Sequence, residues 1–241
     1  MRPHAVHALI AVKRLDQAKS RLADRLPAAH RARLVLAMLA DTVTAASAVP
    51  QIRSITVVTP DAAVTDLVGT LGATAHPEPP LGSPDEPARA GVVAAGAHTD
   101  GLNTALAHAA ASVRASHPGA DLLVLQADLP ALRPAELAGM LAAAPPHGRA
   151  VVVDHTGSGT AALLVRDGGD LAPAFGPDSA RRHIAAGAVE LTGYWPGLRL
   201  DVDTAADLER VVALGAGSST RAVLHDIGWF CHVHEPVRRV C

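Results

Sequence analysis

The spacing of apolar and polar positions in the first half of the chain predicts strands and helices in alternation. Short apolar runs have the length and β-branched content of buried strands, and they lie at residues 6–12, 52–59 and 121–126. Apolar residues at helical spacing predict helices at residues 30–48, 61–70, 102–116 and 134–144. Strands that alternate with helices in this way favour a parallel sheet with crossover helices.

The second half of the chain has a different pattern. Two apolar runs, at 150–154 and 160–166, flank the letters HTGSG, which indicates a β-hairpin with a Gly-rich turn. A final helix is expected to begin at Thr204 and to run to about residue 214, with Asp207 completing an approximate capping box. Shorter elements are predicted between them: a helix at 178–186 and strands at 189–192 and 198–202. A hairpin element is therefore added to the parallel sheet.

Two regions depart from these regular elements. Residues 77–100 begin with PEPPLGSPDEPARAG, which holds five prolines, so we interpret this stretch as a mobile surface excursion. We take residues 1–222 as one domain and residues 223–241 as an appended tail. Trp229 and Phe230 make the tail apolar enough to dock on the domain or on a neighbouring subunit, which allows a homodimer. The Cys and His residues of the tail fit no standard zinc spacing.

Composition fits one sizeable α/β domain. The chain has 241 residues, of which 49 % are apolar but only 2 % aromatic, so small aliphatic side chains must form the core. A net charge of −2, from 21 basic and 23 acidic residues, gives no general attraction to nucleic acid or to an anionic membrane. No apolar run reaches the roughly 18 residues of a membrane span, and charge comes too early for a signal peptide. With two cysteines near the end, a reducing cytoplasm is the expected setting.

A basic segment follows the first predicted strand. The letters IAVKRLDQAKSRL, residues 10–22, place Lys13, Arg14, Lys19 and Arg21 within nine residues. Ligands of open α/β sheets bind beyond the carboxyl ends of strands, and four cations there would suit a triphosphate. The alternative is a solvated basic loop. The segment contains neither GxxxxGK[ST] nor GxGxxG, so neither a P-loop nor a dinucleotide fingerprint accounts for it.

Aspartates end two of the predicted strands. Asp128 follows the most apolar strand, and Asp201 and Asp203 lie in LRLDVDT. Carboxylates at strand ends are well placed to hold a divalent cation over bound phosphates. Asp128 could instead serve as a helix cap or loop carboxylate. For Asp203 we favour capping of the helix that begins near Thr204.

Two turns offer backbone N–H groups and hydroxyls. Gly157, Gly159 and Thr160 lie in the hairpin turn, and the letters FGPDS occupy residues 175–179. Together they could bind a small phosphorylated carboxylate, although Gly-rich turns are usually only turns.

Seven motifs, taken together and in order, resemble one family over roughly residues 6–222: IAVKRLDQAKSRL, LNTAL, VLQADLPAL, GSGTA, FGPDS, GAVELTG and WPGLRLDVDT. That family is the 2-phospho-L-lactate or phosphoenolpyruvate guanylyltransferases of coenzyme F-420 biosynthesis. The resemblance implies a single Rossmann-like domain of the nucleotide-diphospho-sugar transferase type, with a mainly parallel sheet and an added β-hairpin element. It also implies that GTP and the phosphorylated acid give a guanylyl adduct and pyrophosphate. We favour phosphoenolpyruvate because the motifs look like those of bacterial members.

The resemblance also implies roles for individual residues. It implies that Asp128 and Asp201 hold Mg²⁺ and that Lys19 joins them in catalysis. It further implies an acceptor site formed by Thr160, Gly176 and Ser179, and a GTP site formed by Lys13, Lys19, Arg21 and Asn103. The residues before Asn103 depart from the family pattern, because the chain has Asp-Gly where an acidic residue and proline are usual.

Two alternatives follow from the same residues. The first is another nucleotidyltransferase of this fold, of the molybdenum-cofactor or sugar-nucleotide type. The absence of a Gly-rich LAGGxGxRM-like start argues against it. The second is a non-catalytic nucleotide-binding module, which would bind GTP without releasing pyrophosphate.

Overall fold

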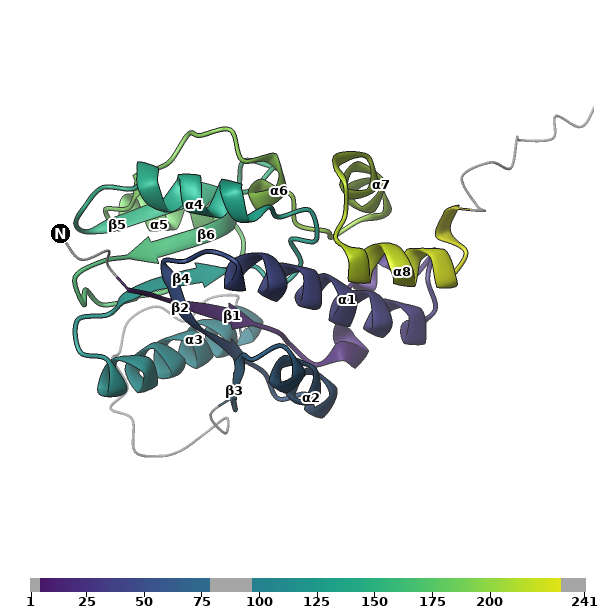
Figure 1. Cartoon of the computed structure of the whole chain (residues 1–241), viewed down its shortest axis with the longest axis horizontal. Coiled ribbons are helices and arrows are strands. Elements are labelled where there is room, and N and C mark those ends of the chain that lie inside the picture. Colours follow the sequence, from purple (N-terminus) through teal and green to yellow (C-terminus); the bar gives the residue numbers. More distant parts are fainter. Residues whose placement is uncertain (1–4, 79–96, 231–241) are drawn as a thin grey trace, which may run out of the picture.

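The strands of the chain form one mixed sheet. The computed structural model describes residues 5–78 and 97–230, and its seven-stranded sheet has the order β3-β2-β1-β4-β6-β5-β7 (Figure 1). Its strands are β1 (Val6–Ala11), β2 (Ile52–Val58), β3 (Thr74–His76), β4 (Asp121–Leu125), β5 (Arg149–Val153), β6 (Thr160–Val165) and β7 (Val189–Glu190). The first four run parallel, β6 is antiparallel to both β4 and β5, and β7 is parallel to β5. The predicted mainly parallel sheet with an added hairpin is confirmed.

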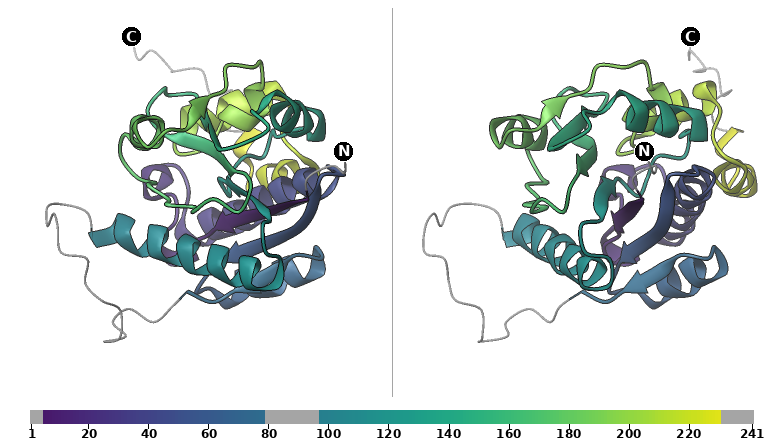
Figure 2. Two further views of the ribbon diagram at one scale, coloured as in Figure 1. Left: turned by 90° about the vertical axis from the view of Figure 1, so that its left-hand side faces the viewer. Right: turned by 60° about the vertical axis from the view of Figure 1, so that its left-hand side comes forward.

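Helices cover both faces of this sheet. The helices are α1 (Ala28–Ser47), α2 (Ala62–Thr70), α3 (Ala97–Ser116), α4 (Pro134–Ala143), α5 (Ser179–Ala185), α6 (Pro196–Arg199), α7 (Ala205–Leu214) and α8 (Ser218–Asp226). Strand alternation divides the core in two, since Ala8 and Ile10 of β1 face the layer of α1 and α2, whereas Leu9 faces α3. Figure 2 shows α1 and α3 on opposite sides of the sheet.

Side-chain capping starts two helices, and the cap at Thr204 is predicted from the sequence. Asp61 accepts a hydrogen bond from the N–H of Ala63 and so caps α2. Thr204 accepts from the N–H of Asp207, whose carboxylate binds back to Thr204, and this capping box starts α7.

The strand predicted at 198–202 is wrong. Pro196 occupies the first turn of the short helix α6, where its fixed φ favours a helical turn. The Arg199 guanidinium then donates to the carbonyls of Val153 and Leu191, at 2.7 and 2.6 Å. These bonds fix the segment beside the end of β5, outside the ladder of the sheet.

Other differences concern element ends. Helix α3 begins at Ala97 rather than at residue 102, and β3 was not predicted because three half-exposed residues give no apolar run. Residues 79–96 of the predicted excursion and 231–241 of the predicted tail lie outside the described residues. Within the described ranges, no helix has the length and apolar character needed to cross a bilayer.

The predicted domain end at residue 222 falls inside helix α8. Leu224 and Trp229 are buried in the same core cluster as α1. The carboxylate of Asp41, on α1, accepts from the N–H groups of Ser219 and Thr220 at 3.0 and 2.8 Å. It takes the capping role that Gly217, at the N-cap, cannot perform. Residues 223–230 are therefore packed as part of the domain.

Replacing Asp41 with alanine should destabilise the protein, because it removes the cap of α8 and two hydrogen bonds to a buried carboxylate. We expect the free energy of unfolding to fall by about 1–3 kcal/mol, measured by urea denaturation. Asp24→Ala, at an exposed position, is the matched control. Equal stability of the two variants would contradict the capping role.

Candidate active site

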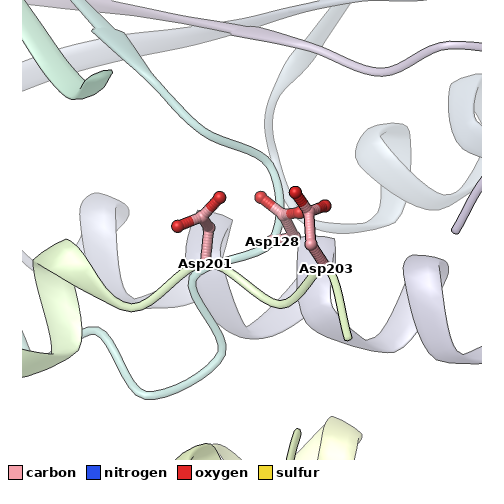
Figure 3. A group of neighbouring side chains, drawn as sticks. All are labelled: Asp128, Asp201 and Asp203. Atoms are coloured by element: carbon pink, nitrogen blue, oxygen red, sulfur yellow. The ribbon is translucent and has the colours of Figure 1, made fainter. Parts of the chain in front are cut away.

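Three carboxylates meet where the parallel strands end. Asp128 follows β4, and Asp201 and Asp203 lie in the extended segment before α7. Each offers an oxygen within 4.8 Å of the others, and Figure 3 shows the three side chains pointing to the same side of the chain segments that carry them. The N–H of Val202 donates to the carbonyl of Asp128 at 3.2 Å and ties the two segments together.

The turn that carries Asp128 is held from behind by α1. The fully buried Thr42 hydroxyl accepts from the N–H of Leu129 at 3.1 Å and lies 3.3 Å from the carbonyl of Ala127. The residues on either side of Asp128 thus contact one side chain of α1. This arrangement fixes the direction in which the carboxylate points.

Lys19 joins the basic segment to these carboxylates. Its ammonium contacts Asp128 and lies 3.0 Å from the Asp203 carboxylate, and Arg21 lies 3.6 Å from the other Asp203 oxygen. Lys19 has a left-handed backbone, with φ of 51°, between two short 3-10 helices at Leu15–Gln17 and Ser20–Leu22. The prediction that Asp203 caps a helix is wrong, because Thr204 is the N-cap and the Asp203 side chain faces Lys19 instead.

The pKa values reflect this concentration of charge. Burial, and then the negative charges of Asp128, Asp203 and Asp154, raise the pKa of Asp201 to about 6. Burial by itself lowers the pKa of Lys19, but the charges of Asp128 and Asp203 outweigh it and raise that pKa, so Lys19 stays protonated. Lys19 thus pairs with two of the three clustered carboxylates, and the carboxylate oxygens and negative charge of the cluster fit a divalent cation such as Mg²⁺.

The other predicted cations lie in the same segment. Lys13 and Arg21 are exposed side chains on either side of Lys19 in the sequence. The segment is anchored to α2, because the N–H of Leu15 donates to the Asp61 carboxylate at 3.0 Å. The cations therefore belong to an ordered loop beyond the end of β1.

Two of the predicted acceptor residues meet in a buried hydrogen-bond network. The Ser179 hydroxyl donates to Thr160 Oγ1 at 3.0 Å, and His183 Nδ1 lies 3.0 Å from the same oxygen. Gly176, three residues before Ser179, has a φ of 120°, which favours glycine. The structure thus brings the hairpin and the FGPDS loop together.

His183 determines which atoms donate and which accept in this hydrogen-bond network. The N–H of Ala174 donates to His183 Nε2, so the ring proton resides on Nδ1 and is donated to Thr160. Burial, followed by the charges of Arg149 and Arg182, lowers the pKa of His183 to about 4, so the ring is neutral at neutral pH. Sequence reasoning missed His183, because one histidine on a short helix carries no motif.

Asn103 lies against the acceptor loop. Its amide donates to the carbonyl of Phe175 at 3.2 Å and accepts from the Phe175 N–H at 2.8 Å. The predicted GTP residue therefore connects α3 with the first residue of FGPDS. Its side chain fixes the loop that carries Gly176 and Ser179.

A second histidine missed by sequence reasoning contacts the carboxylates. His155, in the hairpin turn, places one ring nitrogen 3.3 Å from Asp201 Oδ1 and the other 3.0 Å from Asp207 Oδ1. The only signal in the sequence was its place at the start of HTGSG.

Solved structures of other proteins share this fold. A candidate nucleotide-diphospho-sugar transferase from Desulfovibrio desulfuricans superposes with a TM-score of 0.64 at 14 % identity, over 97 % of this chain and 99 % of that one. A nucleotidyl transferase from Methanothermobacter gives a TM-score of 0.58 at 16 % identity, over 92 % and 99 %. These similarities confirm the predicted fold class.

Curated relatives are closer in sequence, although no protein-family model matches the chain. A protein from Nocardia farcinica, named phosphoenolpyruvate guanylyltransferase, is 72 % identical over 241 residues, covering 100 % of both chains. One of the same name from Rhodococcus erythropolis is 51 % identical over 219 residues, covering 91 % of this chain and 95 % of its own. Identity at this level over whole chains shows that this chain belongs to the phosphoenolpyruvate guanylyltransferase family of nucleotidyltransferases.

Proposed function

We propose that the chain transfers GMP from GTP to the phosphate of phosphoenolpyruvate and releases pyrophosphate, as a step of coenzyme F-420 biosynthesis. The observation that carries the proposal is the contact of Lys19 with the carboxylates of Asp128 and Asp203 at the ends of the sheet. A cation suited to a triphosphate and ligands suited to a divalent metal thus lie side by side, in a chain whose relatives carry this activity in their names.

The reaction is a substitution at the α-phosphorus of GTP. A phosphate oxygen of the acceptor forms the new P–O bond, and the bond between the α-phosphorus and the oxygen that bridges to the β-phosphate breaks. That acceptor oxygen is already ionised at neutral pH, so no general base is required. Positioning and neutralisation of charge supply the rate enhancement. Lys19, Arg21 and Lys13 would neutralise the triphosphate and the departing pyrophosphate.

We assign the metal site to Asp128 and Asp201, with Asp203 beside them. Mg²⁺ prefers oxygen ligands and commonly binds through one or two carboxylates together with substrate phosphates. When bound, it would draw negative charge from the phosphates and favour attack at phosphorus. The carboxylates would hold the ion at the strand ends, and Lys19 would supply a second positive charge.

We assign the acceptor site to Thr160, Gly176 and Ser179. Thr160 Oγ1 accepts hydrogen bonds from Ser179 and from His183, which leaves its own hydroxyl proton to be donated elsewhere. That proton and the backbone N–H groups of the FGPDS loop suit the carboxylate and phosphate oxygens of phosphoenolpyruvate. Asn103 would hold this loop beside the nucleotide.

One assay tests the overall activity. The purified chain is incubated with Mg²⁺, each of the four nucleoside triphosphates, and phosphoenolpyruvate or 2-phospho-L-lactate, and pyrophosphate and product mass are measured. GTP with phosphoenolpyruvate should give the highest kcat/KM. A higher kcat/KM with another acceptor or nucleotide would contradict the proposed substrates. Binding of GTP without release of pyrophosphate would support a non-catalytic nucleotide-binding module. Location in the cytoplasm and a homodimer stay predictions.

Asp128→Asn should reduce turnover by roughly 100-fold or more, because it removes a carboxylate that would hold the metal ion beside the reacting phosphates. The variant should have the same circular dichroism spectrum as the parent and the same elution volume in size-exclusion chromatography. Asp24→Asn, at an exposed site, should retain full activity. Near-normal turnover of the Asp128 variant in saturating magnesium would exclude the metal role.

Lys19→Ala should raise the Kd for GTP by roughly tenfold, because a charge-assisted contact to phosphate is lost. Isothermal titration in the presence of Mg²⁺ measures this affinity. As a control, Arg53→Ala removes one positive charge near the start of β2, away from the strand ends that carry the site. This variant should leave the affinity for GTP unchanged. If both variants bind GTP equally well, the basic segment is only a solvated loop.

Ser179→Ala should raise the KM for phosphoenolpyruvate by about tenfold, because it removes the hydrogen bond that directs the Thr160 hydroxyl proton toward the charged acceptor, and a hydrogen bond to a charged ligand contributes about 1.5–3 kcal/mol. The KM for GTP should change by less than about twofold, because Ser179 lies in the acceptor loop. Steady-state kinetics with each substrate varied in turn separate the two effects, with Ser116→Ala as an exposed control. A selective rise in the KM for GTP would contradict the assignment.

A further inference from the structure

We propose that His155 is a positioning residue that fixes the orientation of the Asp201 carboxylate for metal binding. The inference rests on the metal site of the proposed function and adds to it a residue that does not itself bind metal. The observation behind it is the bridge that the imidazole makes between Asp201 and Asp207.

The bridge lies in a partly enclosed place. The side chain of His155 is 19 % exposed, and those of Asp201 and Asp207 are 14 % and 7 % exposed. Each ring nitrogen faces one oxygen of a different carboxylate, so both polar positions of the imidazole are engaged. One oxygen of Asp201 is held by the ring, and the second oxygen is left for a cation.

Asp207 makes the bridge rigid at its far end. Its Oδ2 accepts from the N–H of Thr204 at 2.8 Å, from the Thr204 hydroxyl at 2.7 Å and from the N–H of Asp203 at 3.3 Å. Its Oδ1 faces His155. One buried carboxylate therefore fixes the backbone at Asp203 and, through His155, the side chain of Asp201.

The backbone on both sides of the bridge is fixed as well. The N–H of His155 donates to the carbonyl of Arg199 at 2.8 Å, and the Arg199 side chain donates to Val153 at the end of β5. The hairpin turn and the segment that carries Asp201 are thereby joined by two connections besides the ring. The imidazole has little freedom to turn away from Asp201.

Positioning, rather than proton transfer, is the role that this geometry supports. Both ring nitrogens are occupied by carboxylates, and the attacking phosphate oxygen needs no base. Side chains that hydrogen-bond to a metal ligand and orient it, without binding the metal themselves, commonly contribute 10- to 100-fold to metal affinity. His155 has this relation to Asp201.

The test compares Mn²⁺ binding by the full chain and its variants without substrates, by titration calorimetry. His155→Ala should weaken Mn²⁺ binding by roughly 10- to 100-fold. It should also raise the Mg²⁺ concentration for half-maximal activity, with less than about a twofold change in the KM for phosphoenolpyruvate. His155→Gln retains a donor and should recover part of the affinity. His225→Ala, an exposed histidine of α8, should bind as the parent does.

The outcomes separate this inference from the proposed function. Mn²⁺ affinity of His155→Ala within twofold of the parent would overturn it, as would a parent that binds no Mn²⁺. If His155→Ala does not fold, His155→Gln provides the test. Full Mn²⁺ affinity of the glutamine variant, together with lost activity, would also overturn the positioning role of His155. If the parent binds Mn²⁺ but makes no product, the proposed function fails while the comparison of affinities still decides the role of His155.

Discussion

The ion pair between the Lys19 ammonium and the carboxylates of Asp128 and Asp203 is the interaction on which the site depends. Carboxylates from two chain segments lie close together at the ends of parallel strands, where their mutual repulsion would oppose folding of the segment before α7. A partly buried cation from the loop after β1 offsets part of that repulsion. It also brings the basic segment against the carboxylate cluster.

The carboxylates are held from behind by residues that do not enter the site. Thr42 contacts the turn around Asp128, Asp207 caps α7 and binds the backbone at Asp203, and His155 reaches Asp201. Each of these contacts comes from a different element of the fold. The carboxylate cluster is therefore preorganised by the packing of α1, α7 and the hairpin, which would limit the entropy lost on binding of a cation.

Much of the fold follows from local sequence signals. The long apolar runs predict the central strands, and the caps at Asp61 and Thr204 follow from side-chain chemistry that acts within four residues. Prediction failed where long-range contacts decide the outcome. The apolar letters at 198–202 suit a strand, but Pro196 and the bonds of Arg199 favour a helical turn outside the sheet. Likewise, only tertiary structure reveals that His155 and His183 contact predicted site residues, because each partner lies more than twenty positions away in the sequence.

Two adjacent residues of α1 link the carboxy-terminal helix to the site. Asp41 caps α8, and Thr42, the next residue, holds the turn that carries Asp128. A change that loosens α8 acts on the same turn of α1 that holds the turn around Asp128. Helix α8 is thus part of the mechanical support of the site. A substitution in the packing residues of α8 would therefore disturb the carboxylate cluster as well as the stability of the fold.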